Sequence, residues 1–207
     1  MSELFSTNLT VCIDAGNLSG YLALAPTVAL VSESGVEVGW LPMTSPLQRL
    51  SARQPDEPTN DPLAGYKARR AAAREKWARR ELERDCERLD ITVDNGARRF
   101  DSSLAGMGVL FLNEHGGDIA SYLTRVYVRA FREGADIEQV DEIARLVGDD
   151  DFRVYAGSTG GLELESLQGR MLKAGVFSSP AYVVKGEVFQ GRQHLPLLRS
   201  KLKDATT

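Results

Sequence analysis

The chain has 207 residues, of which 43% are hydrophobic and 26% charged, a composition that suits one globular domain or one domain with an insertion. This composition excludes a disordered polymer, and no apolar run approaches the length of a membrane-spanning helix. The formal net charge is −4, and the chain starts without a basic or an apolar leader segment. We therefore expect a cytoplasmic protein that binds neither nucleic acid nor membranes.

The first elements are expected to be a strand, a helix and a second strand. Residues 9–13 form a short apolar run that is typical of a central strand. Asn17 is a typical helix cap, and apolar residues follow it at helical spacing as far as Ser32. Residues 36–43 predict another strand, and a β-α-β unit of this kind has a right-handed crossover.

The middle of the chain is predicted to be helical. Residues 45–65 are rich in proline and polar residues and indicate a loop, whereas residues 66–84 combine strong helix formers with Glu/Arg pairs at helical separation. Further helices are expected at residues 117–134, 136–146 and 162–174. His115 is expected in a loop, and no cysteine or second histidine lies at metal-ligand spacing from it, so no metal site is predicted.

The end of the chain predicts a β-hairpin followed by a helix. Residues 181–184 and 187–189 are apolar and flank a Lys-Gly turn, while Pro180, which has no N–H, belongs at the start of the first strand. If the Ser179-Pro180 bond is cis, the backbone N–H and C=O of Ser179 face whatever lies opposite. Residues 195–203 indicate an amphipathic closing helix.

Two cysteines, Cys12 and Cys86, lie far apart in the sequence, and there is no C-x-x-C motif. Dithiol exchange needs two adjacent thiols, one to attack and one to resolve the mixed disulfide, so a dithiol oxidoreductase is not expected. Cys12 lies in the first apolar run and is expected to be buried. We assign no role to Cys86.

Both ends of the chain resemble the DsbA-like thioredoxin-fold superfamily, in its branch of 2-hydroxychromene-2-carboxylate isomerase and kappa-class glutathione transferase. The hairpin with its Phe-x-Gly and the closing helix carry one half of the resemblance, and Asp14, Tyr21, Leu22 and Ala23 carry the other. It implies an α/β thioredoxin-like fold (β-α-β … α-β-β-α) with an all-helical insertion. Residues 1–45 and 158–207 would form the thioredoxin-like domain, and residues 46–157 the insertion.

The resemblance also implies a glutathione-dependent isomerase or transferase that acts on an aromatic or acidic small molecule and forms a homodimer. Asn17 stands where the isomerase branch has its catalytic serine, and Gly20 falls where a second cysteine would be. Asn17 can donate a hydrogen bond to the sulfur of glutathione but cannot relay a proton, and helix capping alone also explains this residue. Ser19 is the nearest hydroxyl that could take its place.

Binding roles follow from the same resemblance. The backbone of Ser179 and Pro180 would pair with the cysteinyl part of glutathione. In the relatives an Asp-Arg pair holds the ends of glutathione; here Gln193 and His194 replace it, while Arg192 is new and could meet a carboxylate.

Arg74, on the basic helix, could bind an anionic ligand from the side of the insertion. Because Asn17, Gln193 and His194 depart from the family pattern, an alternative stays open in which the chain is a catalytically degenerate protein that binds or dimerises.

Overall fold

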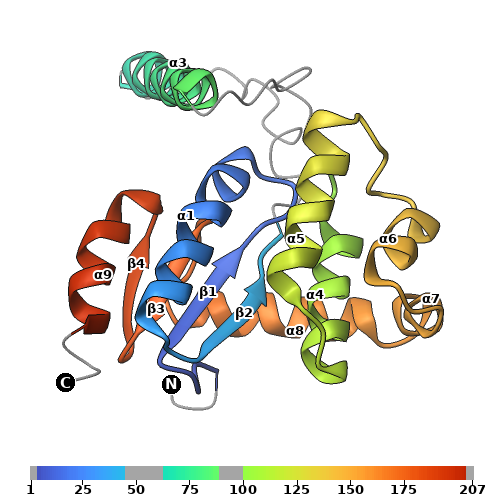
Figure 1. Ribbon diagram of the computed structural model, residues 1–207. Coiled ribbons are helices and arrows are strands. Elements are labelled where there is room, and N and C mark those ends of the chain that lie inside the picture. The colour runs from blue at the N-terminus through green and yellow to red at the C-terminus, as the bar shows by residue number, and fades with distance from the viewer. Residues whose placement is uncertain (1–3, 45–62, 89–99, 204–207) are drawn as a thin grey trace.

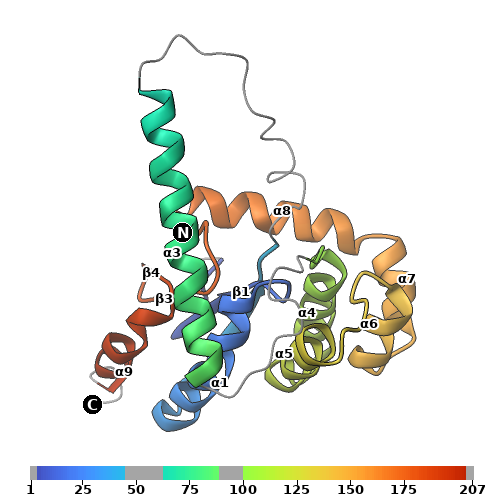
Figure 2. The same ribbon diagram turned by 90° about the horizontal axis from the view of Figure 1, so that it is seen from above.

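The computed structural model describes residues 4–44, 63–88 and 100–203. Within these ranges a mixed four-stranded sheet has the order β2-β1-β3-β4, and helices cover both of its faces (Figure 1). The long helix α3 (Ala64–Arg88) crosses one end of this body, as both views show (Figures 1 and 2). The expected thioredoxin-like fold with a helical insertion is confirmed, and the division of the chain at residues 45 and 158 stays a prediction.

The β-α-β unit forms as the sequence predicts. Strand β1 (Leu9–Ile13) is buried along its whole length, as its uninterrupted apolar run requires. Helix α1 (Leu18–Ser34) starts after the Asn17 cap and ends at Gly35, whose φ of 63° is a left-handed helix cap. Strand β2 (Val38–Pro42) then pairs with β1 in parallel, with Leu9 opposite Val38.

The predicted hairpin joins the opposite side of β1. Strand β3 (Ala181–Val184) is antiparallel to β1 and to β4 (Glu187–Gln190). The turn residues Lys185 and Gly186 have φ values of 51° and 80°, the pair of left-handed residues that a tight hairpin needs. The short helix η2 (Arg192–His194) leads into α9 (Leu195–Lys203), the predicted closing helix.

The two faces of the sheet bury different sets of side chains. Leu9, Val11 and Tyr182 face the larger core, which includes side chains of α1 and α9. Cys12 and Val183 face a smaller core that contains Leu167 and Met171 of α8 (Gly160–Lys173). Alternate residues of one strand thus serve opposite cores, as the pleat of a strand requires.

The inserted helices are α3, α4 (Ser103–His115), α5 (Ile119–Tyr127), the π-helical segment η1 (Val128–Arg132), α6 (Val140–Val147) and α7 (Asp151–Gly157). The predicted loop at His115 is wrong, because this residue is the last of α4. Helices α4 and α7 were not predicted, and the helix expected at residues 117–134 is divided into α5 and η1.

A tertiary contact explains why α4 escapes prediction. Its Gly106 and Gly108 disfavour a helix by intrinsic propensity. The structure needs Gly108, because a Cβ there would lie 2.1 Å from Tyr122 Oη, while that hydroxyl donates a 2.9 Å hydrogen bond to the carbonyl of Ala105. No helix in the described ranges is long and apolar enough to cross a membrane.

Candidate functional site

The turn after β1 meets the loop before β3. The backbone N–H of Asp14 donates a 2.8 Å hydrogen bond to Ser179 Oγ, and the Ser179-Pro180 peptide bond is cis. Pro180 O in turn accepts a 2.7 Å hydrogen bond from the N–H of Gly191. The turn that leads into α1 and the proline loop, which lie at opposite ends of the sequence, are therefore neighbours in space, as the sequence predicts.

Asp14 organises this site, a role that the sequence alone does not reveal. It is 1% exposed, and its Oδ1 accepts hydrogen bonds from Gly16 N at 2.8 Å and from Ser102 Oγ at 2.6 Å. Its backbone carbonyl accepts a 2.8 Å bond from the Tyr127 hydroxyl. A buried carboxyl group needs hydrogen-bond partners of this kind. The position of an aspartate directly after an apolar strand is the feature of the sequence that could indicate such a group.

Asn17 caps α1 in a defined orientation. Its Oδ1 accepts a 2.8 Å hydrogen bond from the N–H of Ser19, which directs the amide oxygen toward the helix. Its Nδ2 makes no hydrogen bond to any residue in the described ranges. Capping and ligand contact are therefore compatible, because the cap uses the acceptor of the amide and leaves its donor. Ser19 is half-buried in the first turn of α1.

At Gly20, where a second cysteine would stand, there is no space for a larger side chain. A Cβ at Gly20 would lie 2.3 Å from Tyr127 Oη and 2.8 Å from the Asp14 carbonyl oxygen. Both of these atoms belong to buried residues that are hydrogen-bonded to each other. The site therefore lacks not only the second cysteine of a dithiol pair but also the space for its side chain.

The loop before β3 presents backbone groups. Gln190 Oε1 accepts hydrogen bonds from Phe177 N at 3.3 Å and from Ser178 N at 3.0 Å, which fixes the loop to β4. The N–H and C=O of Ser179 make no hydrogen bond to any part of the chain that the structure describes. They can thus pair with an extended ligand.

The residues expected to bind the ends of glutathione do not converge on one point. Arg192 forms an ion pair with Asp85 of α3, and Gln193 is exposed and donates a 3.0 Å hydrogen bond to Gln190 O. The ring of His194 lies 5.8 Å from that of Phe189, next to the start of α9. Arg74 is exposed on α3. Within the described ranges, no hydrogen bond or ion pair links these four residues to Asn17 or Ser179.

Aromatic rings line the contact between α1 and the inserted helices. Tyr21, one turn after Asn17, stacks on Tyr127 at 5.3 Å and on Phe131 at 5.8 Å, and Phe131 meets Phe100 edge-on at 5.5 Å. Burial raises the pKa of Tyr127 well above its usual range, so its hydroxyl stays protonated as a donor. The sequence predicts only the helical spacing of these residues, not this cluster.

The described ranges contain no group of three or more His, Cys, Asp or Glu side chains placed to hold a metal ion. No protein-family model and no curated protein matches the chain.

Solved structures do match it along nearly its whole length. A 2-hydroxychromene-2-carboxylate isomerase is 16% identical with a TM-score of 0.70, over 96% of this chain and 95% of that one. A probable DsbA oxidoreductase from Streptomyces coelicolor is 16% identical with a TM-score of 0.66, over 97% and 90%. The cytosolic disulfide reductase DsbM from Pseudomonas aeruginosa, solved with GSH, is 17% identical with a TM-score of 0.63, over 96% and 98%.

At these identities the likeness shows the fold. It bears out the resemblance inferred from the two ends of the chain, since the isomerase and the DsbA-like proteins both share the arrangement of the sheet and the inserted helices. The chain thus has the DsbA-like form of the thioredoxin fold, as found in 2-hydroxychromene-2-carboxylate isomerase.

Proposed function

We propose that the chain is a glutathione-dependent isomerase or transferase that uses the thiol of bound glutathione in place of a cysteine of its own. The observation that carries this proposal is the junction of the α1 cap with the Ser179-Pro180 loop, which offers one side-chain donor and a pair of backbone groups. The GSH-bound DsbM structure shares this fold, and so does the isomerase.

The residues at the junction fit the cysteinyl part of glutathione. Asn17 Nδ2 and the N-terminus of α1 both stabilise negative charge, and a hydrogen bond to a charged acceptor contributes about 1.5–3 kcal/mol. The N–H and C=O of Ser179 can pair with the tripeptide backbone as a neighbouring strand would. When bound, glutathione would supply a thiolate that adds reversibly to a conjugated or otherwise electrophilic carbon.

The rest of the site suits an apolar substrate. The half-buried ring of Tyr21 lies next to the α1 cap and is backed by Phe131, which is consistent with an aromatic or acidic small molecule as the substrate. Asn17 cannot act as a general base, so its role is to hold the thiolate rather than to move a proton. A homodimer and a cytoplasmic location complete the proposal.

Titration calorimetry with glutathione on the natural protein and on two variants tests it. Asn17→Asp keeps the capping oxygen but removes the donor and adds a repelling charge, so we expect at least about tenfold weaker binding with unchanged stability. Asn17→Ser keeps both functions and should bind glutathione as the natural protein does. If the natural protein gives no heat at millimolar glutathione, or if Asn17→Asp binds as well as Asn17→Ser, the proposal fails.

A catalytically degenerate binding protein is the second candidate. The ion pair between Arg192 and Asp85 favours it, because the cation expected to hold a ligand carboxylate already has a partner within the protein. In that case glutathione analogues that lack the thiol, such as S-methylglutathione, would bind as tightly as glutathione itself. Unequal affinities would favour the enzyme.

A further inference from the structure

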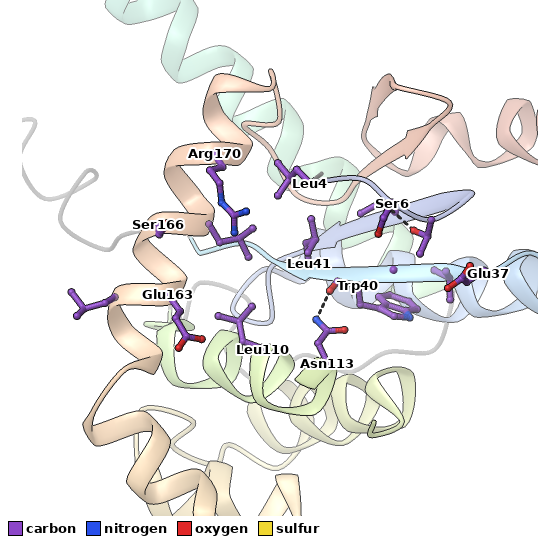
Figure 3. Close-up of a pocket in the computed structure, with 16 residues that line it drawn as sticks. Leu4, Ser6, Glu37, Trp40, Leu41, Leu110, Asn113, Glu163, Ser166 and Arg170 are labelled. Carbon is purple, nitrogen blue, oxygen red and sulfur yellow. Dashed lines mark hydrogen bonds between the residues drawn. The ribbon is translucent and has the colours of Figure 1, made fainter. Parts of the chain in front are cut away.

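A groove of about 740 Å³ lies away from the Asn17 site, beside the free edge of β2 (Figure 3). It is bordered by β2, α4, α8 and the segment that precedes β1. Leu41, Leu110 and Leu167 give it an apolar lining, and its volume falls in the range of typical ligand sites, about 300–1,000 Å³. No role described so far involves this groove.

The backbone of β2 has unused hydrogen-bonding groups at this edge. Glu37 O accepts a bond from Leu9 N, and Met43 N donates to Ile13 O, so odd-numbered residues face β1 and even-numbered residues face outward. Trp40 O accepts a 2.8 Å bond from Asn113 Nδ2, and Pro42 O accepts a 2.8 Å bond from Gln168 Nε2. The N–H and C=O of Val38 and the N–H of Trp40 have no partner in the described ranges.

Three charged side chains line the groove: Arg170 and Glu37 lie toward its two ends, and Glu163 of α8 accepts a 2.8 Å hydrogen bond from the Tyr155 hydroxyl. Arg170 of α8 turns its guanidinium toward the Leu41 end of β2, whereas Glu37 lies at the other end (Figure 3). Neither Arg170 nor Glu37 forms an ion pair or a side-chain hydrogen bond with any residue in the described ranges. A ligand that matches this arrangement carries an acidic group at one end and a basic group at the other.

Backbone donors and acceptors along a strand edge are the features that recognise another extended chain. A second copy of this protein cannot bring its own β2 to that edge, because α4 packs beside β2 in both copies and the inserted helices α6 and α7 stand on the far side of α4 (Figure 1). A single peptide strand is thinner than a sheet flanked by helices and can enter.

We propose that the groove binds one extended peptide segment, which adds to β2 through Val38 and Trp40 and places an acidic side chain on Arg170 and a basic side chain near Glu37. Apolar side chains at alternate positions of the peptide pack on Leu41 and Leu110. Since Asn113 and Gln168 already serve the other outward carbonyls, the pairing is confined to the first half of β2.

Two fluorescent pentapeptides with blocked ends, Lys-Val-Thr-Val-Asp and its reverse, Asp-Val-Thr-Val-Lys, test both strand directions by fluorescence anisotropy. We expect saturable binding of one of them, weakened at least about tenfold by Arg170→Glu. Lys173→Glu makes the same change of charge on α8 outside the groove and should alter the affinity less than about twofold. Both arginine and lysine are exposed, so the variants should fold.

Hydrogen exchange of single backbone amides supplies the second readout. Peptide binding should slow the exchange of the Val38 and Trp40 amides, and N-methylation of the peptide amides that face β2 should abolish binding. The proposal is overturned if neither peptide binds, if Arg170→Glu and Lys173→Glu weaken binding equally, or if the two amides exchange at an unchanged rate.

Discussion

The backbone N–H of Asp14 lies 2.8 Å from Ser179 Oγ, and this hydrogen bond joins two residues that are 165 positions apart. It connects the end of the central strand β1 to the loop before β3, next to the cap of α1. The donor belongs to a residue that is 1% exposed, so water cannot easily replace the serine. The geometry of the candidate site therefore depends on this side chain, whereas ligand binding depends on the Ser179 backbone.

Ser179→Ala should destabilise the protein by about 1–3 kcal/mol, because it removes the hydroxyl that accepts a hydrogen bond from the buried Asp14 amide. Urea unfolding measures this loss. The neighbouring Ser178→Ala is the matched control: Ser178 is exposed, so water can replace its 2.8 Å hydrogen bond to Gln190 Oε1, and its change should stay within about 0.5 kcal/mol. Equal effects of the two substitutions would contradict the role given to Ser179.

Gly20→Ala should destabilise the protein by about 1–3 kcal/mol, since the added methyl group overlaps Tyr127 Oη. Tyr127→Phe removes that oxygen, so the double variant should lose less stability than the sum of the two single losses. Thermal unfolding of all four proteins gives the coupling free energy. Strict additivity would mean that Tyr127 does not limit the space at residue 20.

Asp85→Asn should release the end of α3. This residue forms ion pairs with Arg192 and Arg88, and next to it Cys86 is 8% exposed. Burial, together with the charges of Glu83 and Glu87, raises the pKa of the Cys86 thiol, so it reacts slowly while α3 is docked. We expect Cys86 to react at least about tenfold faster with a disulfide reagent at pH 8 in this variant.

Glu87→Gln is the control for that experiment. It also removes a negative charge beside Cys86 but leaves the ion pair with Arg192 intact, so it should change the reaction rate far less. Mass spectrometry identifies which cysteine is labelled. Labelling of Cys86 at the same rate in the natural protein and in Asp85→Asn would show that the ion pair does not hold α3 in place.

Alkaline pH should weaken the fold through Cys12. Burial raises the pKa of this thiol from 9.0 to about 12. The folded protein holds the proton more tightly than the unfolded chain, so this contribution is complete below pH 9 and is lost as the pH rises toward 12. From this thiol alone, the free energy of unfolding should fall by up to about 1.4 kcal/mol per pH unit in that window.

Urea unfolding between pH 8 and pH 11 measures this dependence, and Cys12→Ala should reduce its slope. Tyr182, whose pKa burial raises to about 12, acts in the same direction and is present in both proteins. The difference between the two slopes therefore isolates Cys12. Parallel curves would show that the thiol does not contribute.

The sequence predicts those parts of the fold that depend on local patterns. Residues 9–13, the hairpin around Lys185 and Gly186, and the closing helix at residues 195–203 all form as expected, because apolar spacing and turn chemistry determine them. The loop expected at residues 45–65 falls largely outside the described ranges.

Elements that depend on distant contacts are not predictable in this way. Helix α4 contains a glycine, Gly108, that only the ring of Tyr122 explains, and no local signal reveals that the Asp14 carboxyl group meets Ser102. Arg192 was expected to bind an anionic ligand, but its partner is Asp85, on a helix from another part of the chain. The residue type of Arg192 alone could not reveal this ion pair.

The overlap between residue 20 and Tyr127 bears on how this site can change over generations. A single codon change to cysteine at residue 20 would place a side chain where the tyrosine oxygen lies, so it would harm the fold before it offered any redox benefit. Introducing two neighbouring thiols requires the tyrosine to be replaced as well, and that step removes a hydrogen bond from the turn after β1. A dithiol pair at this site is therefore opposed by the packing at its first step, and selection can more readily elaborate what the present side chains offer.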